Sequence, residues 1–388
     1  MSVSTASATA PESHLAAVFA QYPFEVVHAE GLWLHTRDGR RILDYYGGHA
    51  VAALGYGHPR WLAALERQAR DVQFQTNAIP MAVRERAAAR LSAFAGLGLD
   101  QVFFVNSGAE ANENALRLAF RLTGRREAVA LEHGWHGRTA AAGAVTHGAR
   151  ERWYGFPQTP FDVRWVSRSD AGAAAAAIGP QTACVIVEPV QGLAGAFDVP
   201  VAVLEALRRR CTEQGALLIF DEVQCGVGRT GWPFAANRAG VTPDMLTTAK
   251  ALGAGFPVSA LLFGAELGAR LRIEDMGTTF GGGPLACAIV ETVIDIIESE
   301  GLLGNVRRMS DLIRQSCIVG PVTAVQGAGL LLGLRTTRPA KEIQRELLAR
   351  GIFAGTAADP QIVRLLPPFT LGEPHVAALA AALAALAP

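Results

Sequence analysis

Short, continuously apolar segments alternate with longer amphipathic segments through the middle of this chain, and this alternation restricts its fold more than any other feature. The apolar segments, which we predict to be strands, are Gln101–Val105, Ala128–Leu131, Ala183–Val187, Ala216–Phe220 and Val258–Phe263. Asn112–Leu122 and Val201–Glu213 have apolar residues three and four positions apart, as crossover helices do. Strands that are apolar on both faces are typical of a parallel sheet covered by helices on each side. The pattern therefore predicts an α/β protein with a mostly parallel central sheet.

The two ends of the chain indicate a second, smaller unit. Gly31–Asp44 resembles a β-hairpin with Asp38 and Gly39 at its turn, and the end of the chain alternates strand and helix on a small scale. Between these ends, a helical pattern begins at Leu285 after a glycine-rich segment and is suited to link two domains. The predicted division is a small α+β domain from residues 1–60 and 284–388, and a large domain from residues 61–283.

Charge and cysteine content exclude several kinds of partner. The 35 Lys plus Arg residues balance 35 Asp plus Glu residues, so no basic surface is available for non-specific nucleic-acid binding. No apolar run approaches the roughly 20 residues of a membrane span. The N-terminal residues 1–14 lack a basic start and an apolar segment, which predicts a short disordered tail. Five widely spaced cysteines favour reduced thiols in the cytoplasm. Because the charge balance disfavours nucleic acid, a small molecule is the expected partner.

Lysine is rare in this chain, which contains only Lys250 and Lys341. Lys250 follows a short apolar strand and precedes a glycine-rich turn, so its neighbours are small or apolar. A partly buried amine has a lowered pKa, which suits Schiff-base chemistry. Lys341 lies in a charged helical segment. We therefore expect Lys250 to be the reactive lysine and Lys341 to be a surface charge.

Two predicted strands end in residues that suit ligand binding. One leads through Ser107 and Gly108 into a helix whose first N–H groups can hold a phosphate, although these residues also suit plain helix capping. The other, Ala216–Phe220, ends in Asp221 and Glu222, where α/β folds bind their ligands. An apolar strand followed by two carboxylates also resembles the Walker B strand of an NTPase. Neither lysine lies in the GxxxxGK[ST] loop which that class requires, so we discard the NTPase interpretation.

A third segment combines His133, Trp135, His136 and Arg138. The two histidines have no further His or Cys cluster to complete a ligand set, so we predict no metal site. An aromatic side chain beside glycines and an arginine better suits a flat ligand that carries a carboxylate.

Six segments lie in a fixed order along the chain: NSGAEANEN, HGWHGRT, VEPVQG, IFDEVQCGVGRTG, AKALGAGFP and GTTFGGGPLACA. In order and spacing they resemble the class III aminotransferases that depend on pyridoxal 5′-phosphate (PLP), especially the acylornithine branch. The resemblance runs from about Phe24 to Thr370. It implies the aspartate-aminotransferase-like fold type I with a seven-stranded central sheet, PLP as cofactor, and a homodimer with active sites at its interface.

The resemblance also assigns residues to the cofactor. Lys250 would hold PLP as a Schiff base and then move the proton of the reacting carbon, while Asp221 would keep the pyridine nitrogen protonated. The other implied contacts are Gly108 and Ala109 at the phosphate, Trp135 and Val223 on the ring faces, Gln224 at the ring hydroxyl, and Thr279 at the phosphate of the neighbouring subunit.

For the substrate, the resemblance implies that Arg138 binds the far carboxylate and that Arg364 binds the α-carboxylate of glutamate. Planar guanidinium groups suit such bidentate contacts. Thr278 is implied to touch the substrate as well. His49 falls where relatives vary the residue at the substrate entrance, so it either contacts an acyl group or only packs.

Two positions depart from the family pattern. Leu193 stands where a glutamate is usual, and that glutamate can pair with Arg364 when the substrate is an ω-amine. Gly283 stands where asparagine is common. Leu193 leaves open what neutralises Arg364, and the effect of Gly283 does not follow from the sequence.

The resemblance implies an aminotransferase that moves the δ-amino group of an N-acylornithine, acetyl or succinyl, to 2-oxoglutarate by a ping-pong cycle in arginine biosynthesis. Alternatives on the same fold are an aminotransferase for ornithine, 4-aminobutyrate or a carrier-bound lysine-pathway substrate, and an aminomutase. A non-catalytic regulator is a third class, against which the intact Lys250 and Asp221 argue.

Overall fold

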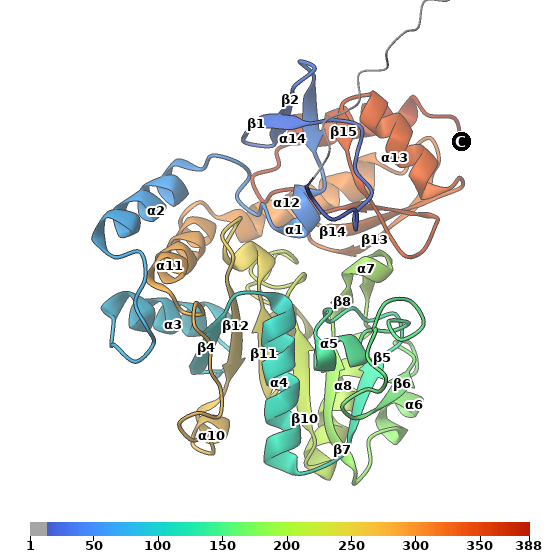
Figure 1. Cartoon of the computed structure of the whole chain (residues 1–388). Helices are drawn as coiled ribbons and strands as arrows, with labels where there is room; N and C mark the ends of the chain where they lie inside the picture. Colours follow the sequence, from blue (N-terminus) through green and yellow to red (C-terminus); the bar gives the residue numbers. More distant parts are fainter. Residues whose placement is uncertain (1–13) are drawn as a thin grey trace, which may run out of the picture.

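The computed structural model describes residues 14–388, and its centre is a seven-stranded sheet (Figure 1). The strand order is β4-β12-β11-β10-β7-β5-β6. All neighbouring strands are parallel except that β12 runs antiparallel to both β4 and β11. The strands are β4 (Gln101–Val105), β5 (Glu127–Leu131), β6 (Asp162–Val166), β7 (Thr182–Val187), β10 (Leu217–Asp221), β11 (Met245–Thr248) and β12 (Ser259–Phe263). The predicted α/β fold with a mostly parallel, seven-stranded sheet is confirmed.

Both faces of this sheet are buried, which explains the continuously apolar strands. Ile186 and Ile219 belong to the hydrophobic cluster that packs against helix α4 (Gly108–Thr123), whereas Val185 and Leu218 belong to the cluster on the side of helix α8 (Val201–Gln214). Successive residues of a strand point to opposite faces, so each strand needs apolar residues at every position.

Helix α11 (Pro284–Ser299) packs against helices α2 (Pro59–Asp71) and α3 (Ala82–Ala95) beside the sheet (Figure 1). Most of its side chains are buried, including Ile289 and Ile297. Pro284 occupies its first turn, where a missing N–H does no harm. The helix predicted from Leu285 is therefore confirmed.

Segments from the two ends of the chain meet in the upper part of Figure 1. One sheet has the order β1-β2-β3-β15, in which β3 pairs in parallel with β15 from the C-terminal part; a second has the order β13-β14-β17-β16. These strands are β1 (Val26–Glu30), β2 (Trp33–Thr36), β3 (Arg41–Asp44), β13 (Val322–Ala328), β14 (Leu331–Thr336), β15 (Ile352–Phe353), β16 (Gly355–Thr356) and β17 (Ile362–Leu365). The predicted hairpin is confirmed, and Gly39 turns with a φ of 82° that glycine tolerates. The division at residues 60 and 283 stays a prediction.

Shorter elements complete the described chain: α1 (Gly47–Ala50), α5 (Ala140–Ala144), α6 (Ala171–Ala176), β8 (Val190–Gln191), α7 (Gly192–Gly195), β9 (Phe197–Asp198), α9 (Ala235–Ala239), η1 (Lys250–Leu252), α10 (Ala265–Gly268), α12 (Leu302–Ser316), α13 (Ala340–Ala349) and α14 (Glu373–Ala384). Within residues 14–388, none of the helices has the length and apolar character needed to cross a bilayer. Residues 1–13, which hold nearly all of the predicted N-terminal tail, lie outside the described part.

Candidate functional site

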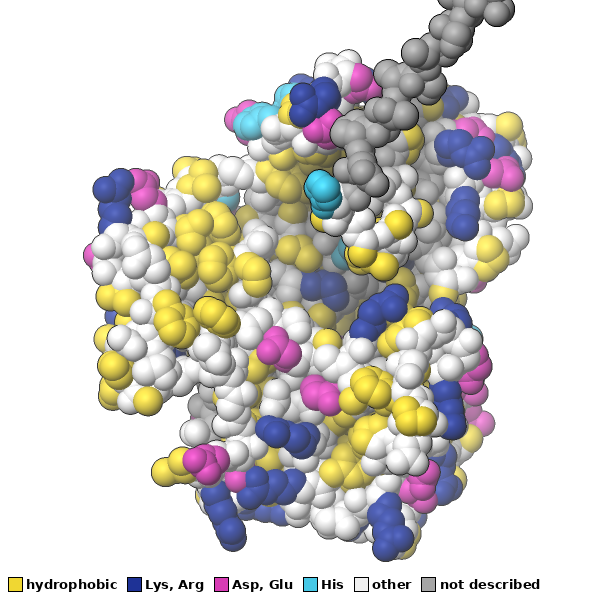
Figure 2. Space-filling view, viewed as in Figure 1, with side chains coloured by type: hydrophobic (Ala, Val, Ile, Leu, Met, Phe, Trp, Pro, Cys, Tyr) yellow, Lys and Arg dark blue, Asp and Glu magenta, His cyan; other side chains and the backbone are white. Residues whose placement is uncertain are grey.

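A cavity of about 890 Å³ opens where the parallel strands of the central sheet end. Figure 2 shows the corresponding hollow between the two parts of the molecule, with basic side chains inside it. Nine of the predicted site residues line this cavity: Gly108, Ala109, Trp135, Arg138, Asp221, Val223, Gln224, Lys250 and Arg364. Loops that follow β4, β5, β7, β10 and β11 supply most of the lining, as expected for a ligand site in an α/β fold.

Thr278 and Thr279 do not line the cavity of their own chain. They lie in the segment between α10 and α11, where Thr279 is exposed. The Thr278 hydroxyl accepts a hydrogen bond from the N–H of Gly281 at 3.1 Å, which shapes the local turn. Thr278 and Thr279 therefore have no part in the cavity of their own chain as the described residues form it.

The start of helix α4 offers free N–H groups to the cavity. Ser107 and Glu110 form a capping box, in which the Ser107 hydroxyl accepts from the N–H of Glu110 at 3.2 Å and the Glu110 carboxylate accepts from the N–H of Ser107 at 2.8 Å. Gly108 and Ala109, in the first turn, have N–H groups with no partner inside the helix. A helix start of this kind, lining a cavity, is suited to bind a phosphate.

Three N–H donors converge on the buried carboxylate of Asp221 at the end of β10. Asn112 and His136 each donate to Oδ2 at 2.7 Å, and the N–H of Val223 donates to Oδ1 at 3.0 Å. Because a carboxylate only accepts, the His136 Nδ1 carries the proton in this contact. The donors hold the Asp221 side chain in one orientation and supply the partners that a buried carboxylate needs.

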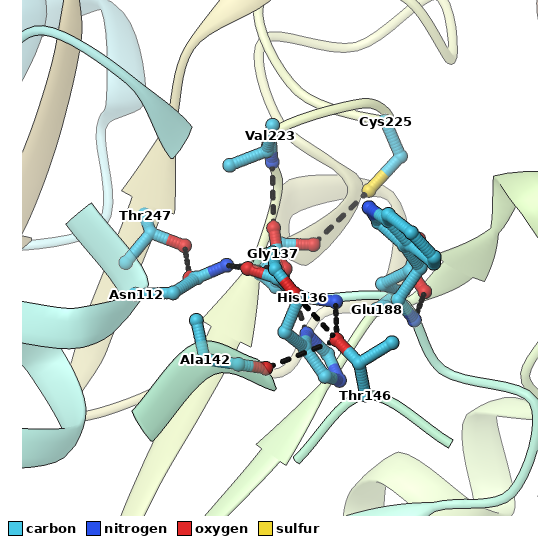
Figure 3. A network of polar contacts seen from close by, with 11 residues as sticks. Asn112, His136, Gly137, Ala142, Thr146, Glu188, Val223, Cys225 and Thr247 are labelled. Carbon is cyan, nitrogen blue, oxygen red and sulfur yellow. Dashed lines mark hydrogen bonds and ion pairs between the residues drawn. The ribbon is translucent and has the colours of Figure 1, made fainter. Parts of the chain in front are cut away.

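A second set of contacts positions Asn112 and His136, the two residues whose side chains donate to Asp221. The Thr247 hydroxyl donates to Asn112 Oδ1 at 2.6 Å, which fixes the amide so that its NH₂ group faces Asp221. The backbone N–H of His136 donates to the Thr146 hydroxyl at 2.9 Å (Figure 3). His136 was one of the two histidines first considered as metal ligands. In the structure its ring donates a hydrogen bond to Asp221.

Lys250 begins the short 3₁₀-helix η1 and lies beside Asp221 in the cavity lining. Its φ of 47° is in the left-handed region, which is strained for a residue with a side chain and is found most often at functional sites. Burial lowers the pKa of the Lys250 amine, although the carboxylates of Asp221 and Glu188 oppose this effect. The lowered pKa leaves more of the amine unprotonated and nucleophilic.

Glu188 is a buried carboxyl group in the same cavity, and the sequence alone gave it no role. Its Oε1 accepts from the N–H of Trp135 at 2.8 Å. Burial raises the pKa of Glu188 to about 7, while His136 works in the opposite direction. Its place directly after the fully buried strand β7 was the signal that could have identified it.

Trp135 and Val223 both line the cavity, as expected of groups that would cover a flat ring. Gly108 packs closely against Val223, because a Cβ on Gly108 would lie 2.6 Å from Val223 Cγ1. Gln224 is likewise confined, since a Cβ on Gly192 would lie 1.7 Å from its Oε1. The contact with the short, branched Val223 side chain requires glycine at position 108, whereas a side chain at position 192 would displace the end of Gln224.

Arg138 lies at the cavity, exposed, and contacts two neighbouring indole rings whose centres are 5.6 Å apart. Its guanidinium carbon is 5.2 Å from the ring centre of Trp135 and 4.4 Å from that of Trp153. No described residue forms an ion pair or hydrogen bond with it, so all five of its N–H groups are available. Sequence reasoning missed Trp153, which is brought to Arg138 only by tertiary packing.

Arg364 occupies the centre of β17 and is only 2% exposed. Its Nε donates to the Thr356 carbonyl at 2.7 Å, Nη1 to the Gly192 carbonyl at 3.3 Å and Nη2 to the Tyr46 hydroxyl at 3.3 Å. Burial lowers the pKa of this guanidinium. All three acceptors are neutral, and within the described residues no carboxylate forms an ion pair with Arg364.

The two departures from the family pattern have different surroundings. Leu193 lines the cavity in α7, next to the Gly192 carbonyl that accepts from Arg364. Gly283 is the N-cap residue of α11 and does not line the cavity. Nothing in the structure explains the glycine at 283.

The residues present fit the predicted cofactor. The α4 start would hold the phosphate, Trp135 and Val223 would cover the two ring faces, and Asp221 would face a positively charged ring nitrogen. Lys250 supplies an amine with a lowered pKa, as a carbonyl-binding lysine requires.

Comparison with known proteins points the same way. The family profile described as aminotransferase class-III matches residues 16–386. The chain is 39% identical over 384 residues to the acetylornithine aminotransferase of Mesorhizobium japonicum, covering 94% of this chain and 93% of that protein. It is 42% identical over 367 residues to the acetylornithine aminotransferase of Streptomyces coelicolor, covering 92% and 89%.

Two solved structures resemble this fold closely. The acetylornithine aminotransferase of Elizabethkingia anophelis superimposes with a TM-score of 0.84 at 27% identity, over 96% of this chain and 95% of that one. The ornithine aminotransferase of Toxoplasma gondii superimposes with a TM-score of 0.89 at 26% identity, over 96% and 91%.

Proposed function

The chain belongs to the class III aminotransferases and is a PLP-dependent transaminase, and on this premise we propose that it transfers the δ-amino group of an N-acylornithine to 2-oxoglutarate. The observation that carries this proposal is a single cavity with the lysine and two arginines that are free of carboxylate partners among the described residues. Both curated relatives named above are acetylornithine aminotransferases, which favours an acylornithine over the other amino donors.

The two arginines divide the recognition of the two substrates. Arg138 binds the far carboxylate of each, which is the α-carboxylate of the acylornithine and the γ-carboxylate of glutamate. Arg364 binds the carboxylate next to the reacting carbon, which only glutamate and 2-oxoglutarate have. Guanidinium groups bind such carboxylates with two parallel hydrogen bonds.

Bound PLP supplies the electron sink for the negative charge that forms at the reacting carbon. Asp221, oriented by Asn112 and His136, would stabilise the positive charge on the protonated ring nitrogen of the cofactor. Lys250 Nζ would take the proton from the reacting carbon and deliver it to the cofactor carbon C4′. The N–H groups of Gly108 and Ala109 hold the phosphate, Trp135 and Val223 fix the ring plane, and Gln224 contacts the ring hydroxyl.

A homodimer is part of the proposal. Large apolar side chains are exposed beside α2, α3 and the segment before α11, among them Phe280 at 66% and Phe74 at 43%, whose rings lie 5.2 Å apart. Figure 2 shows hydrophobic side chains gathered over that side of the molecule. A second copy would cover this surface and would receive Thr279 at its phosphate and Thr278 near its substrate.

We place the enzyme in arginine biosynthesis in the cytoplasm. All five cysteines are unpaired and buried, which supports a reducing compartment. The large and small domains divide at residues 60 and 283 in this proposal, so that the cavity lies where they adjoin.

The visible absorbance of the purified holoenzyme tests the function. We expect N-acetylornithine or N-succinylornithine, added without a keto acid, to bleach the cofactor colour, and 2-oxoglutarate to restore it. The acyl group that bleaches at the lower concentration identifies the donor. Lys250→Ala is the matched control and should not cycle. Colour that persists with both acylornithines, but bleaches with another amine, would overturn the substrate assignment.

A further inference from the structure

Arg364 has five N–H groups, and three of them are already used. One on each nitrogen is donated to a neutral oxygen: the Thr356 carbonyl, the Gly192 carbonyl and the Tyr46 hydroxyl. Two N–H groups therefore remain, one on Nη1 and one on Nη2. That is the number needed to bind the two oxygens of one carboxylate.

Tyr46 is the only side chain among the described residues that accepts a hydrogen bond from Arg364. Its hydroxyl also lies 2.6 Å from Nδ1 of His49. Since the Tyr46 oxygen accepts from Arg364, its own proton is free to be donated to an unprotonated His49 Nδ1. Partial desolvation of the imidazole lowers the pKa of His49, and the positive charges of Arg364 and Lys250 lower it further, which keeps Nδ1 able to accept.

The backbone that presents these two side chains is strained. Gly47, Gly48, His49 and Ala50 form a left-handed turn with φ of 54°, 54°, 64° and 71°. Left-handed backbone is unfavourable for His49 and Ala50, so the surroundings must hold it. Such strain is commonly kept where a functional side chain has to be placed.

The surroundings do hold the turn from several sides. The Asp44 carboxylate accepts from the N–H groups of Tyr46 at 2.8 Å and Gly47 at 2.9 Å. Buried Arg229 donates to the Ala50 carbonyl at 3.3 Å. The Tyr46 ring lies directly on the backbone of Gly355 in β16, where a Cβ would come within 2.1 Å of the ring.

We propose that Tyr46 and His49 are positioning residues that orient the buried Arg364 guanidinium toward the substrate carboxylate next to the reacting carbon. This inference rests on the proposed function, because it assigns Arg364 to glutamate and 2-oxoglutarate. The cationic Arg364 thus has only neutral hydrogen-bond partners, and its contact with Tyr46, which contacts His49 in turn, stands in place of an ion pair. Arg364 is thus oriented without a competing carboxylate. Tyr46 and His49 therefore favour substrates that carry a carboxylate next to the reacting carbon over substrates that do not.

Four variants of the holoenzyme test the proposal. Tyr46→Phe removes the acceptor, and His49→Gly removes the partner of Tyr46 at a backbone position that glycine suits. His49→Asn keeps an acceptor oxygen where Nδ1 stood and tolerates left-handed backbone. Tyr56→Phe is the matched control, since its hydroxyl donates to Asp44 at 2.6 Å and so supports the same turn without facing Arg364.

Two readouts separate positioning from general damage. The first is the affinity for glutarate, an unreactive dicarboxylate, by calorimetry; the second is the half-saturating concentration of glutamate and of N-acetylornithine in single half-reactions. We expect Tyr46→Phe and His49→Gly to weaken glutarate and glutamate about tenfold and to leave N-acetylornithine within about twofold. His49→Asn should restore most of the affinity, and Tyr56→Phe should affect both substrates alike.

Unchanged glutarate affinity in Tyr46→Phe would overturn the proposal, as would equal weakening of both substrates in Tyr46→Phe and Tyr56→Phe. A failure of the proposed function has a different signature: the wild type would then react with glutamate but not with any acylornithine. The glutarate measurements decide the role of Tyr46 and His49 in either case.

Discussion

The two arginines of the cavity are oriented by opposite means. Arg364 is buried in a strand, and hydrogen bonds to three neutral oxygens fix the direction of its N–H groups. Arg138 is exposed, and the indoles of Trp135 and Trp153 restrict its position while leaving every N–H free. In the proposed function, hydrogen bonds fix Arg364 for one carboxylate position, whereas aromatic contacts let Arg138 adjust to another. A ping-pong enzyme needs both, since its two substrates differ in the distance from the reacting carbon to the far carboxylate.

Arg364→Lys should have the largest effect. A single ammonium group cannot replace three structural hydrogen bonds and a bidentate carboxylate contact at once. We expect kcat/KM for 2-oxoglutarate to fall about a thousandfold, or about 4 kcal/mol, and that for the acylornithine by less than about tenfold. Stopped-flow half-reactions measure both. Arg138→Lys is the comparison and should lower both half-reactions together; a similar pattern in the two variants would remove the distinction between the arginines.

Leu193→Glu should have the next largest effect. Leu193 adjoins the Gly192 carbonyl that accepts from Arg364, so a glutamate there would place a carboxylate within reach of the two remaining N–H groups. The new side-chain carboxylate would compete with the substrate glutamate for Arg364 and raise the half-saturating concentration of that substrate about tenfold. Leu193→Gln, which has the same shape without the charge, should change it much less. Steady-state kinetics with varied glutamate would detect the difference, and equal effects of both substitutions would refute competition by charge.

Trp153→Leu tests the aromatic side of the comparison. It removes one of the two rings that contact Arg138, and a cation over an aromatic face is worth roughly 0.5–2 kcal/mol. We expect KM for both substrates to rise about fivefold with kcat nearly unchanged, because Arg138 would still be present but less well oriented. Trp153→Phe should stay within about twofold of the wild type. If leucine and phenylalanine behave alike, the ring face does not position Arg138.

The smallest effect concerns pH. The pKa of Glu188 is raised to about 7, so this carboxyl group is mostly neutral below pH 7 and gains a negative charge as pH rises through that value. The negative charge of ionised Glu188 acts on the Arg364 guanidinium, whose pKa it raises. Glutarate should therefore bind about two- to threefold more weakly at pH 8 than at pH 6. Calorimetry on Glu188→Gln should show this pH dependence abolished; an unchanged dependence would assign it to another group.

Features carried by short stretches of sequence were predictable. Asp221 ends one apolar strand, Lys250 follows another, and Ser107 and Gly108 mark the start of a helix, so each could be placed without coordinates. The antiparallel direction of β12 could not be read, because a strand buried on both faces has the same composition in either direction.

Other features depend on contacts between distant parts of the chain. Strand β6 lies at the edge of the sheet and alternates exposed with partly buried residues, which hides it from a search for continuous apolar runs. Trp153 meets Arg138, and Tyr46 meets Arg364 across more than three hundred residues, only through tertiary packing. No local sequence pattern predicts such contacts, so the roles of Trp153 and Tyr46 could be inferred only from the structure.

The pairing of β3 with β15 bears on when activity can first arise during synthesis. β3 ends at Asp44, but its partner β15 begins only at Ile352, and β17, the strand that carries Arg364, begins at Ile362. All seven strands of the central sheet are complete once Phe263 has left the ribosome. Lys250 and Asp221 can therefore be in place on a nascent chain that still lacks Arg364. Under the proposed role of Arg364, transamination must wait for nearly the last segment to be translated, and a chain truncated before it has no means of selecting its keto acid.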